Sequence, residues 1–193
     1  MANYRFLLAF PQFALLTFLA CGVGLPLHAA VSAQEQRTKM NDGLFLLHYV
    51  LDQEKDLDLI LIVKSTPDSV GTFVKHIAQT AKDDLALLDR MQAGDRYLTR
   101  DHNPLPALEI EAREGIKADK QHLLLFGTTG RAYGRLLLVT QIEAGNYMVN
   151  LTKAMTSGEK DPDRVKTLLH ISAQWGAIRD QSLHLLGTLG DER

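Results

Sequence analysis

Apolar residues recur every three or four positions along most of the chain, which is the spacing of one face of an α-helix. The first such stripe consists of Met40, Leu44, Leu47 and Leu51, and Leu59 and Ile62 continue it beyond a charged patch at 52–58. This pattern predicts a helix over 36–64 that can kink within the patch. The run 59–63 would also suit a buried strand on composition, but no partner strand is visible, so a helix is favoured.

The same spacing predicts four more helices, over residues 67–92, 106–126, 130–156 and 162–189. Ser65-Thr66-Pro67-Asp68 and Asp161-Pro162 indicate helix starts, because each combines a capping side chain with a proline suited to the first turn. Thr129 is the expected cap of the helix over 130–156, and Thr156-Ser157-Gly158 is its expected stop. Glycines at 187 and 190 are expected to fray the last helix.

Each of these helices carries its own inward stripe. In chain order the stripes are Val70, Val74, Ile77, Ala81, Leu85 and Leu88; Leu108, Ala112, Ile116 and Leu123; Tyr133, Leu137, Ala144, Met148 and Leu151; and Val165, Leu168, Ser172, Trp175, Ser182 and Leu186. Small residues flank Trp175 in the last stripe, and a large aromatic side chain there would fill the space that they leave. We therefore predict that Trp175 is buried.

The lengths of the connections predict the topology. The first and last pairs of long helices are joined by only a few residues, so each pair must form an antiparallel hairpin. The middle connection runs over 93–129, which is 37 residues and includes the helix at 106–126. Two hairpins joined by one long crossover is the ferritin-like arrangement of a four-helix bundle. The predicted fold is all-α, with up-down helix pairs and a helical crossover between the second and third core helices.

The N-terminal segment has the composition of a targeting sequence. Arg5 is the only charged residue among the first 33, and an apolar run over 6–25 leads to the small residues Ala29-Ala30-Val31-Ser32-Ala33. A charged start, an apolar middle and a small-residue end are the three parts of a secretory signal peptide. We predict a signal peptide over 1–33, cleaved after Ala33 or else after Ala30, and one helical-bundle domain over 34–193. The predicted location is the periplasm or cell envelope.

Two alternatives to cleavage stay open. The segment could remain as a membrane anchor, although its apolar stretch at 13–25 is shorter than the roughly 20 residues that span a bilayer. Cys21 could carry a lipid, although only Ala20 among the preceding residues fits the expected motif. Cleavage would leave no cysteine and no transmembrane span, which excludes disulfides, zinc–thiolate sites and thiol catalysis in the mature chain.

In its layout the chain resembles a group of exported bacterial ferritin-like domains of uncharacterised function. The shared features are the signal peptide, a long first helix, a proline-led second helix and the glycine-containing break at 127–130. These features cover nearly all of the mature chain. The most distinctive stretch of sequence is 140–147. The resemblance implies a four-helix bundle of the kind that often holds two metal ions.

A count of ligands argues against such a metal site. The di-metal pattern needs a Glu from each of two helices and a Glu-x-x-His from each of the other two. No Glu in the chain is followed by His at the third position, and the helices at 67–92 and 162–189 contain no Glu. The nearest match is Asp119 before His122, on the crossover helix. We predict no di-iron centre and no cofactor.

Four histidines on the long helices were considered as candidates. His170 and His184 share a polar side of the last helix and are expected to be solvated. His48 and His76 flank the apolar stripes of neighbouring helices. A shared site is one interpretation of this pair, and two separate, hydrogen-bonded boundary histidines are the favoured one.

The best candidate for a site lies midway along the helix at 130–156. At about 100° per residue, Thr140 falls within the apolar arc, Gln141 near one edge, and Glu143 with Tyr147 near the other. These four side chains could form a small-ligand site or a polar network. The favoured alternative is structural: Thr140 bonds its own backbone carbonyl, while Gln141 and Glu143 reach the boundary.

Composition narrows the choice of function. The chain has 21 Lys+Arg and 23 Asp+Glu, a formal net charge of −2. It therefore lacks the excess of basic residues that is typical of nucleic-acid-binding proteins. One hypothesis is a non-catalytic envelope protein that acts through its surface or by self-association. The other is a ferritin-like protein that binds a metal or a small molecule. The ligand count favours the first, and no catalytic residue is assigned.

Overall fold

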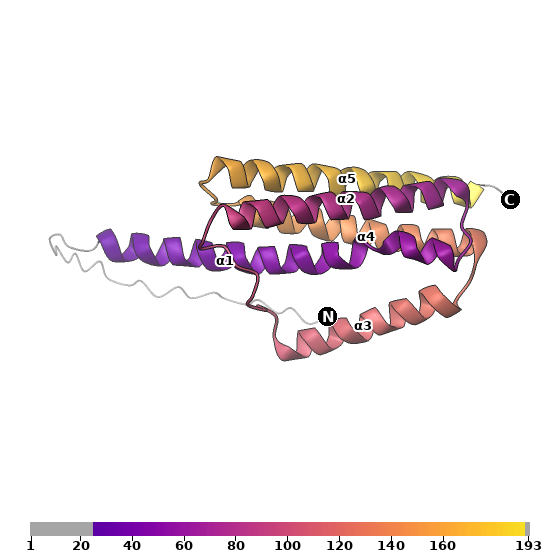
Figure 1. Cartoon of the computed structure of the whole chain (residues 1–193), viewed down its shortest axis with the longest axis horizontal. Helices are drawn as coiled ribbons and strands as arrows, with labels where there is room; N and C mark the ends of the chain where they lie inside the picture. The colour runs from indigo at the N-terminus through magenta and orange to yellow at the C-terminus, as the bar shows by residue number, and fades with distance from the viewer. Residues whose placement is uncertain (1–24, 192–193) are drawn as a thin grey trace, which may run out of the picture.

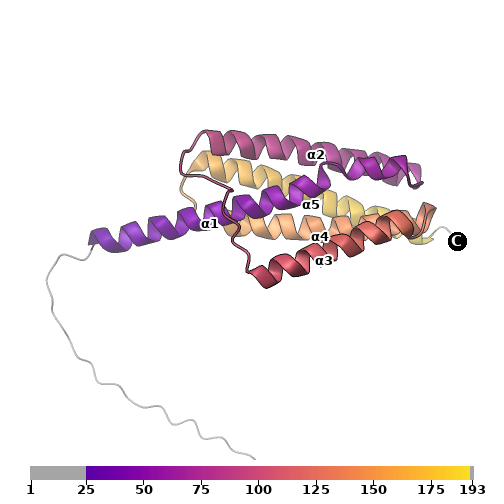
Figure 2. The same ribbon diagram turned by 60° about the horizontal axis from the view of Figure 1, so that its bottom comes forward.

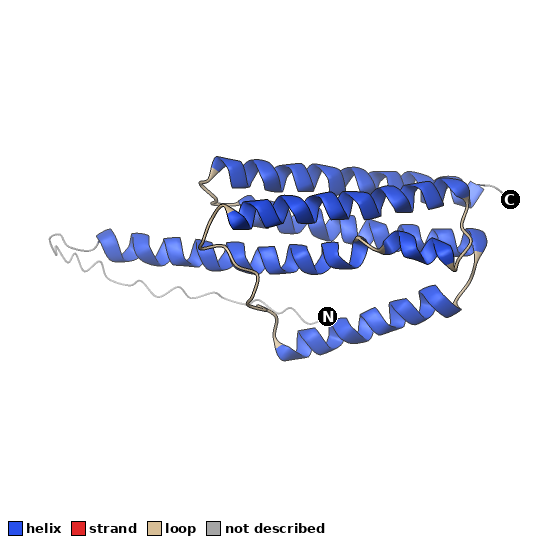
Figure 3. Ribbon diagram, viewed as in Figure 1, coloured by secondary structure: helices blue, strands red, loops and turns tan. Residues whose placement is uncertain are grey.

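A computed structural model describes residues 25–191. Every secondary-structure element in this range is a helix, and loops connect the helices (Figure 3). In chain order they are α1 (Leu25–Glu54), the 3-10 helix η1 (Leu57–Ile62), α2 (Asp68–Ala93), α3 (Ala107–Phe126), α4 (Gly130–Thr156) and α5 (Pro162–Asp191). The all-α prediction is confirmed. Most of the predicted signal peptide, at 1–24, lies outside the described residues. Among the helices that are described, none has the length and apolarity needed to cross a bilayer.

Four long helices lie side by side, and α3 lies outside them (Figures 1 and 2). Helix α1 packs on α2 and α4, α5 packs on the same two helices, and the most extensive pairing is that of α4 with α5. Helices α1 and α2 run in opposite directions, as do α4 and α5 (Figure 1). The long connection at 94–129 runs back along the outside of these helices and contains α3, as the loop lengths predict.

The core is built from the stripes that the sequence predicts. Burying a large aliphatic side chain stabilises the fold by about 1.5–3 kcal/mol, so these stripes supply most of the driving force. Stripe residues that are fully buried include Met40, Leu44, Leu47, Leu51, Val70, Val74, Ile77, Ala81, Leu88, Tyr133, Leu137, Met148, Leu168 and Trp175. Ala144, Leu151, Leu85 and Leu186 pack partly buried against them.

The first helix ends earlier than the sequence pattern predicts. Helix α1 stops at Glu54 and the chain continues as η1, in which about three residues complete a turn instead of 3.6. The apolar stripe therefore loses its phase. Leu59 and Ile62, which were expected to face inward, are 56% and 79% exposed, whereas Leu57 and Ile60 pack against the core. The prediction of one α-helix to residue 64 is wrong, but the break between Glu54 and Leu57 falls within the patch at 52–58, where a kink was expected.

The other end of α1 also differs from the prediction. The helix begins at Leu25 instead of residue 36, and its first turns project beyond the other helices (Figure 1). Ala33, Gln34 and Glu35 are exposed, and Met40 is the first buried side chain of α1 among those described. Among the side chains described, the contribution of α1 to the core therefore begins at Met40, after the predicted cleavage site at Ala33.

The starts of α2 and α4 lack the predicted capping hydrogen bonds. Pro67 is the N-cap of α2, not its first residue, and no side chain caps that helix. Thr129 is the N-cap residue of α4, as predicted, but its side chain forms no capping hydrogen bond. The N–H of Gly130 instead donates to the carbonyl of Ser65 at 2.9 Å, and Gly130 has a φ of 64°, a conformation that favours glycine.

The turn between α4 and α5 follows the prediction more closely. Gly158 has a φ of 85° where α4 ends. The Oδ1 atom of Asp161 accepts hydrogen bonds from the N–H groups of Asp163 and Arg164, both at 3.0 Å, so the predicted cap of α5 is confirmed. The far end differs, because α5 continues through Gly187 and Gly190 to Asp191.

The predicted inward stripe of α3 is wrong at its first three positions, and Leu123, the fourth, lies outside the described side chains. Leu108 is 78% exposed, and Ala112 and Ile116 are also exposed. The cause is the position of α3: four helices already enclose the core, so the apolar residues of a fifth helix on the outside have no core to enter. Glu109 and Arg113 instead point toward a cleft beside α1 and α4.

Trp175 is fully buried, as predicted, and it has a buried partner that the sequence did not indicate. Its indole N–H donates to Oδ2 of Asp84 on α2 at 2.9 Å, and both residues are 0% exposed. Burial raises the pKa of Asp84 to about 6, although the hydrogen bond from Trp175 acts in the opposite direction. Oδ1 of Asp84 is buried and accepts no hydrogen bond from the described residues.

A glycine on α4 allows the close approach of α5 beside this pair. A Cβ atom at Gly145 would lie 2.9 Å from the carbonyl oxygen of Trp175 and 2.7 Å from Cβ of Arg179. A backbone atom cannot move aside without shifting the helix, so any larger residue would push α4 and α5 apart. Gly145 therefore helps to set the position of Trp175 relative to α2.

Candidate functional site

A cleft of about 300 Å³ lies where α3 leans against α1 and α4. We call it the side cleft. Helix α1 contributes Tyr49, Val50, Gln53 and Glu54; α3 contributes Glu109, Arg113, Ile116 and Lys117; and α4 contributes Thr140, Glu143, Ala144 and Tyr147. Three of the four residues predicted from the sequence therefore line one cavity, together with side chains from two other helices.

Arg113 is central to the side cleft. Its guanidinium carbon lies 5.8 Å from the ring centroid of Tyr49 and 5.9 Å from that of Tyr147, within the range of cation–π attraction. Its Nε atom donates to Oε1 of Glu109 at 2.8 Å, one helical turn away. Partial burial acts to lower the pKa of Arg113, but the bond to Glu109 and the neighbouring Tyr147 raise it above its ordinary value. The cleft thus contains a fixed organic cation between two aromatic rings.

Thr140 and Gln141 have mainly structural roles. The hydroxyl of Thr140 donates to the carbonyl of Leu137 at 2.8 Å, which is the bond that the structural interpretation predicted. Gln141 is buried, not at the boundary, and it does not line the cleft. Its Nε2 donates to Oε2 of Glu54 on α1 at 2.9 Å, so it ties α4 to α1 behind the cleft.

Glu143 and Tyr147 do lie in the side cleft. Glu143 is exposed, as the favoured structural interpretation expects, and not near the interior as the alternative of a buried site requires. The reason is that α3 stands away from α4 here and leaves the cleft open to solvent. Tyr147 is half-buried beneath the Arg113 guanidinium.

Sequence analysis missed Arg113 and Tyr49, which share the cleft with the predicted residues. The available signal was the pair Glu109 and Arg113, spaced four residues apart on a helix that also carries apolar positions. The apolar stripe of that helix predicts a different inward face, and it gives Arg113 and Tyr49 no role.

The histidines do not form a shared site. His48 is buried, with Nη1 of Arg100 at 2.8 Å from its Nδ1, and Asp89 3.8 Å from its Nε2. Burial and Arg100 lower the pKa of His48, against the opposing effect of Asp89. His76 is exposed and stands beside Phe73. The favoured interpretation of separate histidines fits these positions.

The remaining candidates for metal ligands are also dispersed. His170 and His184 are exposed, as predicted. His122 is exposed and its ring lies 5.1 Å from that of Phe126. Within the residues that the structure describes, no three His, Cys, Asp or Glu side chains come together in a group that could hold a metal ion.

Comparison with known proteins gives no match: neither a protein-family model, nor a curated protein, nor a solved structure is similar to this chain.

Proposed function

We propose that this protein is an exported helical bundle of the cell envelope that acts by binding and not by catalysis. The N-terminal segment supports export through its charge pattern and small-residue end. The first turns of α1, around the expected cleavage site at Ala33, project beyond the other helices (Figure 1). Their removal would leave every buried side chain from Met40 onward in place.

The connection of the helices supports a ferritin-like arrangement within this proposal. Helices α1 and α2 form one antiparallel pair, α4 and α5 form the other, and the connection between the pairs includes α3. One long crossover between two hairpins is the feature that distinguishes ferritin-like bundles from bundles with short loops. The support for a ferritin-like arrangement comes from the topology of the helices. Proteins that share a fold can have different functions, so this arrangement does not assign a function.

The single observation that supports binding is the environment of Arg113. Two tyrosine rings lie close to its guanidinium, and three carboxylates line the same cleft, those of Glu54, Glu109 and Glu143. Aromatic faces and carboxylates are the groups by which proteins recognise organic cations. The side cleft is therefore a cation site in which the protein's own arginine lies, and its ligand class is an organic ammonium or guanidinium compound.

Binding of an external cation should respond in opposite directions to two substitutions. Arg113→Met keeps the apolar stem and removes the resident charge, so we expect the affinity for tetramethylammonium to rise. Tyr147→Leu keeps bulk and removes one aromatic face, so we expect the affinity to fall about five- to tenfold, equivalent to roughly 1–1.4 kcal/mol. Isothermal titration calorimetry with tetramethylammonium chloride, against sodium chloride of equal ionic strength, measures both changes.

Arg135→Ala is the matched control, because Arg135 is exposed on α4 and does not line the side cleft. It should leave the affinity within twofold of the parent, by the usual small effect of surface substitutions. The proposal fails if Arg113→Met and Tyr147→Leu shift the affinity in the same direction, or if tetramethylammonium binds neither the parent nor Arg113→Met.

A further inference from the structure

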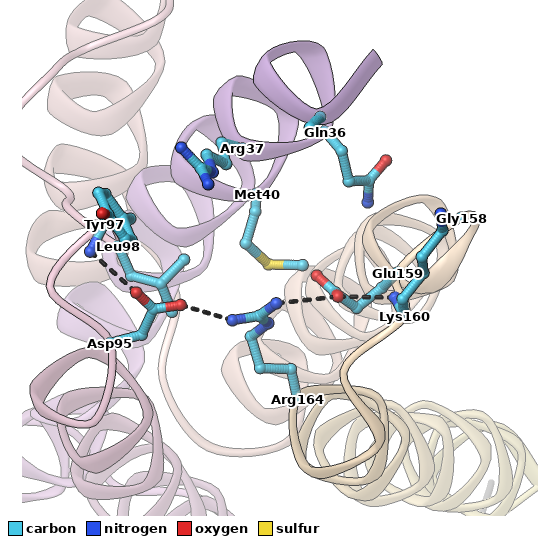
Figure 4. Close-up of a pocket in the computed structure, with 11 residues that line it drawn as sticks. Gln36, Arg37, Met40, Asp95, Tyr97, Leu98, Gly158, Glu159, Lys160 and Arg164 are labelled. Atoms are coloured by element: carbon cyan, nitrogen blue, oxygen red, sulfur yellow. Dashed lines mark hydrogen bonds and ion pairs between the residues drawn. The ribbon is translucent and has the colours of Figure 1, made fainter. Parts of the chain in front are cut away.

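A second and larger cavity lies at the end of the helices where α4 turns into α5 (Figure 4). We call it the end cavity. It is formed by residues 33–40 of α1, the connection that follows α2, the turn at 158–160, and Arg164 of α5. Its volume is about 510 Å³, which is within the range of small-molecule sites. It shares no lining residue with the side cleft.

Arg164 of α5 is held rigidly in the end cavity. Its Nη1 donates to Oδ2 of Asp95 at 2.6 Å, and its Nη2 donates to Oε1 of Glu159 at 3.0 Å. Glu159 has a side chain only 5% exposed, and it also accepts the backbone N–H groups of Lys160 and Asp161. Both carboxylates are thus committed to Arg164 and to the backbone, and the guanidinium cannot turn without breaking these bonds.

Two buried N–H donors in the same cavity have no acceptor. They are Nε of Arg164 and Nε2 of Gln36, and neither donates to any atom of the described residues. Figure 4 shows Gln36 reaching in from α1 and Arg164 from α5, with the Met40 side chain between them. A buried donor without an acceptor has lost its hydration without compensation. Oxygen atoms of a ligand in the end cavity would supply what each of these donors lacks.

The charges around the end cavity favour an anion. Arg37, Lys160 and Arg164 line it together with the carboxylates of Asp95 and Glu159. Both carboxylates pair with Arg164, and Oδ2 of Asp161 lies 3.8 Å from the same guanidinium. The Arg37 guanidinium stacks 4.5 Å from the ring centroid of Tyr97, which holds that cation at the rim. The positive charges of Arg37 and Lys160, away from these carboxylates, would attract an anion from solution.

The floor of the end cavity is apolar. Met40 and Leu98 line it and are 2% and 6% exposed. A hydrocarbon portion of a ligand placed on them would be removed from water, which is favourable in proportion to the area covered. The cavity therefore combines an anion-binding side with an apolar floor.

We propose that the end cavity binds a small organic anion. Its carboxylate or phosphate group accepts hydrogen bonds from Nε2 of Gln36 and Nε of Arg164, and its apolar part lies on Met40 and Leu98. This inference goes beyond the proposed function, because it concerns a different cavity and a ligand of opposite charge.

The side-chain N–H resonances of Arg164 and Gln36 report on this binding directly. In ¹H–¹⁵N spectra of the isolated protein, we expect hexanoate to shift both resonances along a saturable curve. Hexyl phosphate tests whether phosphate replaces carboxylate, and a saturable shift by either anion supports the proposal and assigns the head group. Hexanol has the same apolar chain without the charge, and it should shift neither resonance. Linear, unsaturated shifts with both anions, or an equal response to hexanol, would overturn the proposal.

Gln36→Leu separates binding from folding. Gln36 takes part in no hydrogen bond through Nε2, so its replacement removes a buried unpaired donor and should leave the melting temperature unchanged or higher. The affinity for the anion should fall roughly ten- to a hundredfold, the equivalent of one hydrogen bond to a charged group. Gln181→Leu, at an exposed position of α5 outside the cavity, is the control and should bind as the parent does. Unchanged affinity in Gln36→Leu would contradict the assignment of the site.

Discussion

Replacement of Trp175 by alanine is expected to lower the free energy of unfolding by about 3–5 kcal/mol, the range for truncation of a buried aromatic side chain. Trp175 is 0% exposed and packs in the common core. Its removal leaves a cavity and also takes the hydrogen bond from the buried carboxylate of Asp84. Chemical denaturation monitored by circular dichroism measures the change, since the variant has lost its only tryptophan.

Trp175→Phe separates the two contributions. Phenylalanine retains most of the volume but cannot donate to Asp84, so this variant should lose about 1–3 kcal/mol, the penalty of leaving a buried polar group unsatisfied. A Trp175→Ala variant with the stability of the parent would show that α5 is rotated differently about its axis. A Trp175→Phe variant as unstable as Trp175→Ala would show that the hydrogen bond, and not the packing, holds the pair together.

Asp84→Asn is expected to abolish a fall in stability between pH 4 and pH 7. Burial raises the pKa of Asp84 in the folded protein from 3.8 to about 6. The folded state therefore binds the proton more tightly than the unfolded state, and stability is highest below pH 4 and declines as the pH rises through 6. A shift of this size corresponds to about 3 kcal/mol. Asparagine keeps an oxygen for Trp175 and carries no charge at any pH.

The measurement is the difference in free energy of unfolding between the variant and the parent at pH 4, 5, 6, 7 and 8. This difference should move in favour of Asp84→Asn as the pH rises and level off above pH 7. Asp119→Asn, at an exposed position of α3, is the control for the loss of one carboxylate. A flat difference for Asp84→Asn would mean that Asp84 stays ionised throughout, with a partner that compensates its charge.

The long helices were predictable because each carries a regular apolar stripe. Helix α4 begins and ends at the predicted residues, 130 and 156, and its Tyr133, Leu137 and Met148 are buried as expected. The pattern was less informative where a helix has two plausible faces. On α3 the apolar stripe predicts the inward face, but Arg113 is the residue that lies against Tyr49 and Tyr147, because a helix outside a closed core gains little from an apolar face turned toward it.

The candidate site was predictable only along one helix. Angular position placed Thr140 and Tyr147 on the correct side of α4, but it could not show which residues of α1 and α3 complete the cleft. Gln141 and Asp84 illustrate a second limit. A polar side chain can be buried when a partner from a distant helix satisfies it, as Glu54 and Trp175 do, and such long-range pairs leave no periodic signal in the sequence.

Export with removal of the N-terminal segment is the claim on which the proposed role in the envelope depends most. The intact mass of the protein recovered from the cell-envelope fraction tests it in one measurement. We expect the mass of a chain that begins at Gln34, or at Val31 if cleavage follows Ala30. A mass that includes Met1, or a lipid addition on Cys21, would contradict the account.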